Sequence, residues 1–117
     1  MPLTQNIKNL INYSADSIIS LIDITQRQID FIAEDNLKRF KELDAQSIIL
    51  FNSLKRSQAI ILEQKDVIAA ADKKILSKYT QLLEKLEQVN KLKYHILSQR
   101  TSHLLNVINS INSTVEA

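Results

Sequence analysis

Three long stretches of the chain repeat apolar or small residues every three or four positions. In the first, the spacings are 4, 3, 4, 3, 4, 4 and 3, between Ile7, Ile11, Ser14, Ile18, Leu21, Thr25, Ile29 and Ile32. This is the period of an α-helix that buries one face. We therefore expect a helix over residues 3–33, with Thr4 as its candidate N-cap and Pro2 just outside it.

The segment 33–36, Ala-Glu-Asp-Asn, is the first candidate break, because Asp35 or Asn36 can accept hydrogen bonds from the first amides of a new helix. A second apolar series predicts a helix over 36–64. A third series, with Tyr79, Leu86 and then Leu92 or Lys93 on its stripe, predicts a helix over 73–113. For residues 64–73 the pattern favours a turn ending near Asp72, with a bend in one continuous helix as the alternative.

These elements predict an all-α fold: one domain, residues 1–117, built as an antiparallel bundle of three long helices with short links. The third helix is the longest, so its last two or three turns should overhang the bundle. The residues that we expect to bind a partner are Leu97, Leu104, Leu105, Val107, Ile108 and Ile111, and Val115 continues their stripe. Such a stripe is costly to leave in water, because full burial of one aliphatic side chain is worth about 1.5–3 kcal/mol.

The composition points away from catalysis. The chain has no glycine, no cysteine and one proline, which argues against tight-turned sheets, phosphate-binding loops and thiolate chemistry. His95 and His103 lie about 12 Å apart along a helix, too far to share a metal ion. Glu87 has Lys91 four residues on, as in an ordinary helix ion pair. We expect no enzyme activity, no cofactor and no metal.

The charge is balanced, with 15 Lys and Arg against 13 Asp and Glu, and it lies almost entirely between Arg27 and Arg100. This balance argues against nucleic acid as a partner. No apolar run approaches the roughly 20 residues that cross a bilayer, and no signal peptide is recognisable. The sequence thus predicts a soluble cytoplasmic protein that does not insert into membranes.

The layout resembles the FlgN family of flagellar export chaperones, with the FliT family as a near alternative. Three features carry the resemblance: the acidic step within IDFIAEDNLKRFKELDAQSIILFNSLK, the link at 65–72, and the long helix containing LLEKLEQVNKLKYHILSQRTSHLLNVINSI. The resemblance implies a chaperone that binds hook-associated proteins before type III export, and captures a client helix on its C-terminal helix.

Two other interpretations remain open from the residues themselves. In one, the chain is a structural coiled-coil or self-associating adaptor, and its stripe packs on the first helix or in a homodimer. In the other, an amphipathic helix lies on a membrane surface. The second is disfavoured, because the polar faces of both terminal segments lack the basic residues that anionic lipids attract.

Overall fold

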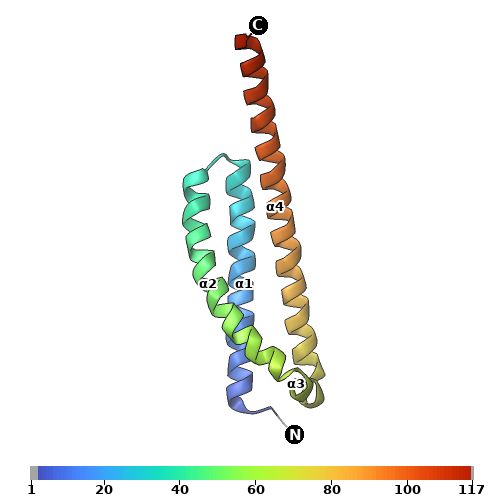
Figure 1. Ribbon diagram of the computed structural model, residues 1–117. Helices are drawn as coiled ribbons and strands as arrows, with labels where there is room; N and C mark the ends of the chain where they lie inside the picture. Colours follow the sequence, from blue (N-terminus) through green and yellow to red (C-terminus); the bar gives the residue numbers. More distant parts are fainter. Residues whose placement is uncertain (1–2, 117) are drawn as a thin grey trace.

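The computed structural model describes residues 3–116, with side chains up to residue 112, and contains four helices in this range (Figure 1). Three are long: α1 (Gln5–Ala33), α2 (Leu37–Glu63) and α4 (Lys73–Glu116); α3 (Lys65–Ala71) is short. The predicted all-α class is confirmed. Pro2 and the side chain of Val115 lie outside the described residues.

The link between the second and third long helices differs from the prediction. Residues 65–71, expected as a turn, form α3, and only Gln64 and Asp72 separate it from its neighbours. The segment is rich in alanine, the strongest helix former, so it stays helical between the two breaks. Asp72 then starts α4, because its Oδ1 accepts from the amides of Lys74 and Ile75 at 3.2 and 3.3 Å.

The turn between α1 and α2 is built without glycine. Asp35, the residue after the C-cap of α1, has the left-handed conformation with φ 61°. Glycine is the usual residue at this position. The amide of Asn36 donates to the carbonyl of Phe31 at 2.8 Å, and that of Asp35 to Ile32 at 3.2 Å, as in a Schellman motif. Asn36 then caps α2 through the Arg39 amide. The predicted break is confirmed, and Asn36 is the cap.

Side-chain pairs define how the long helices run. On α1 and α4, Ser14 bonds Tyr79 and Gln28 bonds Lys93, each pair being 65 residues apart, so these helices are parallel and in register. α2 runs antiparallel to α1. Tyr13 forms a hydrogen bond with Ser53, whereas Gln28, further along α1, donates to the carbonyl of Phe40, which comes earlier on α2. The three long helices therefore run up, down and up, and the described residues add the short α3, a fourth helix that the prediction lacked.

α1 is the central helix. Its apolar stripe packs against both α2 and α4 in a core made of Leu3, Ile11, Ile18, Leu21, Ile22, Leu54, Ile61, Ile68, Tyr79 and Leu86. α2 slants across α1 towards the start of α4, where α3 packs (Figure 1). Over the described residues, no Cα atom of α2 lies within 8 Å of one in α4. The bundle is therefore open along one side.

Candidate functional site

The C-terminal part of α4 extends well beyond the rest of the bundle. α4 has 44 residues against 29 in α1 and 27 in α2, and its last turns project past the α1–α2 turn (Figure 1). Every residue from 101 to 112 is exposed. We call residues 101–112 the overhang.

An ion pair marks where the overhang begins. Arg100 on α4 pairs with Asp35, the left-handed residue of the α1–α2 turn. This pair again joins residues 65 apart, so it continues the register of α1 against α4. Because α1 ends at this level, the residues of α4 beyond Arg100 have no part of α1 to pack on.

The structure brings together five of the six predicted partner-binding residues. These five are exposed by 42–56%, and they are Leu104, Leu105, Val107, Ile108 and Ile111. Leu97 is different: it lies below Arg100 and is half-buried. The apolar surface of the overhang is therefore formed by the five residues after Arg100.

The apolar stripe of the overhang prolongs the inner face of α4. Tyr79, Leu86 and Lys93 recur every seven residues and are buried, and Leu104 and Ile111 follow on the same side of the helix. Below Arg100 this face packs on α1. Above it, the same kind of face has no cover within the described chain.

A groove on the open side of the bundle is a second feature, which sequence reasoning missed. It encloses about 560 Å³ between α2 and α4, with Leu21 and Thr25 of α1 between them. Ile48 and Phe51 line it from α2, and Tyr94 from α4. α2 has apolar residues away from its buried stripe, such as Ile48, Ile49 and Phe51, but this pattern alone does not place them beside α4.

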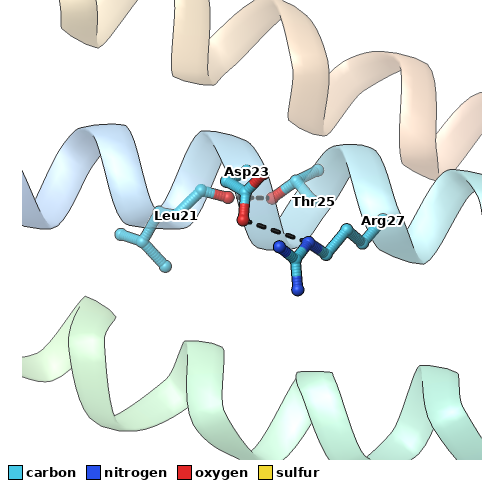
Figure 2. Close-up of polar contacts among 4 residues, drawn as sticks. All are labelled: Leu21, Asp23, Thr25 and Arg27. Carbon is cyan, nitrogen blue, oxygen red and sulfur yellow. Dashed lines mark hydrogen bonds and ion pairs between the residues drawn. The ribbon is translucent and has the colours of Figure 1, made fainter.

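Figure 2 shows the α1 segment that borders this groove. Thr25 donates its hydroxyl to the Leu21 carbonyl at 2.7 Å, which satisfies a buried polar group within its own helix. Asp23 and Arg27 form an i,i+4 ion pair on the exposed face of α1. The groove side of α1 thus presents a leucine side chain and a threonine whose hydroxyl is already bonded.

A buried polar network closes the end of the groove nearest the α1–α2 turn. Lys93 Nζ donates to Gln28 Oε1 at 3.2 Å, and Gln28 Nε2 lies 3.3 Å from both Asp44 Oδ1 and the Phe40 carbonyl. Gln28 is fully buried and Lys93 is 7% exposed. Burial lowers the pKa of Lys93, and nearby Asp44 partly offsets this by favouring the charged amine.

Lys93 also resolves a choice that the sequence left open. The inner stripe of α4 passes through Lys93, whereas Leu92 is half exposed. The aromatic rings of Phe40 and Tyr94 lie 5.9 and 5.2 Å from Nζ, so the lysine is enclosed by ring faces as well as by amide oxygen.

The described residues hold no cluster of three or more His, Asp or Glu side chains placed to bind a metal ion. Over the same residues, no helix is both long and apolar enough to cross a membrane. Glu87 and Lys91 form the predicted ion pair at 3.1 Å. The overhang and the groove are the candidate sites.

Comparison with protein-family models, with curated proteins and with solved structures finds no match to this chain. Its function must be argued from the overhang and the groove.

Proposed function

We propose that this protein is a non-enzymatic chaperone or adaptor that captures a helix of a client protein on the overhang of α4. The observation that carries the proposal is the exposure of five aliphatic side chains on one helical stretch with no Asp, Glu, Lys or Arg. Five such side chains in water are unfavourable, so a stripe of this kind is typical of a binding surface.

The geometry suits helix-on-helix recognition. Leu104, Ile108 and Ile111 lie at i, i+4 and i+7, the spacing with which one amphipathic helix packs along another. The ion pair between Arg100 and Asp35 joins α4 to the α1–α2 turn directly below the stripe. A rigid helix loses little conformational entropy on binding, which favours affinity.

The resemblance to flagellar export chaperones suggests the class of client. On that basis we propose hook-associated proteins as clients and the cytoplasm as the place of capture. Such a chaperone acts by burying the client's apolar helix in a stoichiometric complex, without a nucleotide.

The proposal is tested by capture from the native cytoplasm on the full chain and on Leu104→Asp/Ile108→Asp. We expect the wild type to retain axial flagellar proteins and the double variant to lose them. The matched control is Ser102→Asp/Asn106→Asp, which adds the same charge on the opposite face of the same turns. Recovery of the same proteins on all three baits, or of no flagellar protein on the wild type, contradicts the proposal.

A further inference from the structure

Each chain carries one uncovered aliphatic helix and one open groove between two helices. We infer that two copies associate antiparallel, with the overhang of each lying in the α2–α4 groove of the other. The inference uses the same stripe as the proposed function, so a second copy and a client helix would compete for it. It goes beyond the proposed function because it assigns an occupant to the groove.

The lengths of helix and groove agree. On α4 the groove extends down to Leu86, 14 residues before Arg100, or about 21 Å. From Thr101 to Glu116 the projecting part of α4 has 16 residues, or about 24 Å. When two molecules meet at their α1–α2 turns, each projecting helix therefore reaches the far end of the other's groove.

The charges also agree. The overhang has no ionised carboxylate, amine or guanidinium between Arg100 and Glu116. In the groove, Lys93 is bonded to Gln28 and lies near Asp44, so neither charge needs a counter-ion from an incoming helix. A helix bearing charges on its apolar face would have to desolvate them there, whereas the overhang brings only aliphatic groups.

The groove walls carry the large apolar side chains of Ile48, Phe51 and Tyr94 among polar ones such as Asn52 and Asn90. Ile48 and Tyr94 are exposed by 56% and 64% although they line a concave surface. With the turns meeting, Leu105 of a second copy would lie level with Tyr94, about 8 Å from the turn. Ile111 would lie about 17 Å from it, nearest to Ile48 and Leu21. At each level the cross-section then becomes four helices around one core, a common and stable packing.

Twofold symmetry makes the arrangement self-limiting. Both molecules use the same two surfaces, so the contact is formed twice and closes without leaving either surface free for a third copy. An overhang-to-overhang contact alone would leave both grooves open.

Because the chain has no cysteine, introduced thiols test the arrangement directly. One variant carries Ile48→Cys on the groove wall. A second carries Ile111→Cys on the overhang, 11 residues or about 17 Å beyond Arg100, which is level with Ile48 when the two turns meet. The two are mixed and oxidised. Within one chain these positions cannot meet, since residue 48 lies 12 residues below the turn on α2, about 18 Å, and a disulfide needs Cα atoms within about 7 Å.

We expect a cross-linked dimer, double the 13.4 kDa of one chain, from the mixture but not from either variant oxidised alone. The control is Ile49→Cys, next to Ile48 and exposed by 72% but outside the groove. It should give no cross-link with Ile111→Cys. Equal yields from Ile48→Cys and Ile49→Cys, or no cross-link at all, would overturn the proposal.

Sedimentation of the unmodified chain gives an independent readout. The wild type should approach twice the monomer mass as concentration rises, and Leu105→Asp/Ile108→Asp should stay monomeric with unchanged helix content. A wild type that is monomeric at every concentration, or a variant that still dimerises, contradicts the inference. A monomeric wild type that still captures flagellar clients would contradict the dimer but agree with the proposed function.

Discussion

Lys93 Nζ lies 3.2 Å from Gln28 Oε1 at a level of the bundle where both side chains are shut off from water. Gln28 in turn donates towards Asp44 and the Phe40 carbonyl on α2. One glutamine of the central helix therefore connects all three long helices. Buried polar groups of this kind are costly when a partner is removed.

Lys93→Met should lower the free energy of unfolding by about 1–3 kcal/mol, because it leaves the fully buried Gln28 Oε1 without its donor. The double variant Gln28→Leu/Lys93→Met should recover most of that loss, since both buried polar partners are then replaced by apolar groups of similar size. Urea unfolding followed by circular dichroism measures both. If the double variant is as unstable as the sum of its parts, the two side chains are not coupled.

The pH dependence of stability should report Lys93 and Tyr79 with opposite signs. Burial lowers the pKa of Lys93, so as pH rises from neutral towards the ordinary lysine value of about 10.4, the folded amine loses its proton before the unfolded one and stability increases. Burial raises the pKa of Tyr79, with its bond to Ser14 acting the other way, so above the ordinary value of about 10 the unfolded phenol ionises first and stability falls.

The control for this pH profile is a pair of variants. Lys93→Met should remove the rise, and Tyr79→Phe should remove the fall, in urea unfolding repeated across the alkaline range. A wild-type profile that coincides with that of Lys93→Met would contradict the assignment of the rise to Lys93.

Asp35 occupies a left-handed position in a chain that has no glycine to place there. Asp35→Ala should lower the free energy of unfolding by about 1 kcal/mol relative to Asp35→Asn, because asparagine tolerates this conformation and alanine does not. Asp35→Gly should be at least as stable as Asp35→Asn. Because all three variants remove the ion pair with Arg100 equally, differences among them measure the backbone alone; equal stabilities of the alanine and asparagine variants would refute the explanation.

Much of the fold is predictable from the sequence, because helices depend on a local period and local caps. The stripe from Ile7 to Ile32, the N-cap at Thr4 and the break before Leu37 all follow from side chains a few residues apart, and the structure confirms them. The prediction of a turn over residues 65–71 was wrong. The residues that interrupt the helix, Gln64 and Asp72, are single, and the alanines between them favour a helix.

The exposure of Leu104 and its neighbours was also predictable, since it depends only on the relative lengths of the helices. The groove was not. It depends on the angle at which α2 crosses α1 and on the lack of contact between α2 and α4, which are tertiary properties that no local pattern encodes. The burial of Lys93 belongs to the same class, because its partners lie on two other helices.

The central claim is that the overhang contributes a surface for another molecule and nothing to the core of its own chain. The most direct test is the free energy of unfolding of the chain lacking residues 102–117, measured by urea titration at concentrations low enough to keep the protein monomeric. We predict a value within about 0.5 kcal/mol of the full chain, as for changes away from the core. A loss of several kcal/mol, as expected when buried leucines and isoleucines are removed, would show that the stripe belongs to the fold and would contradict the claim.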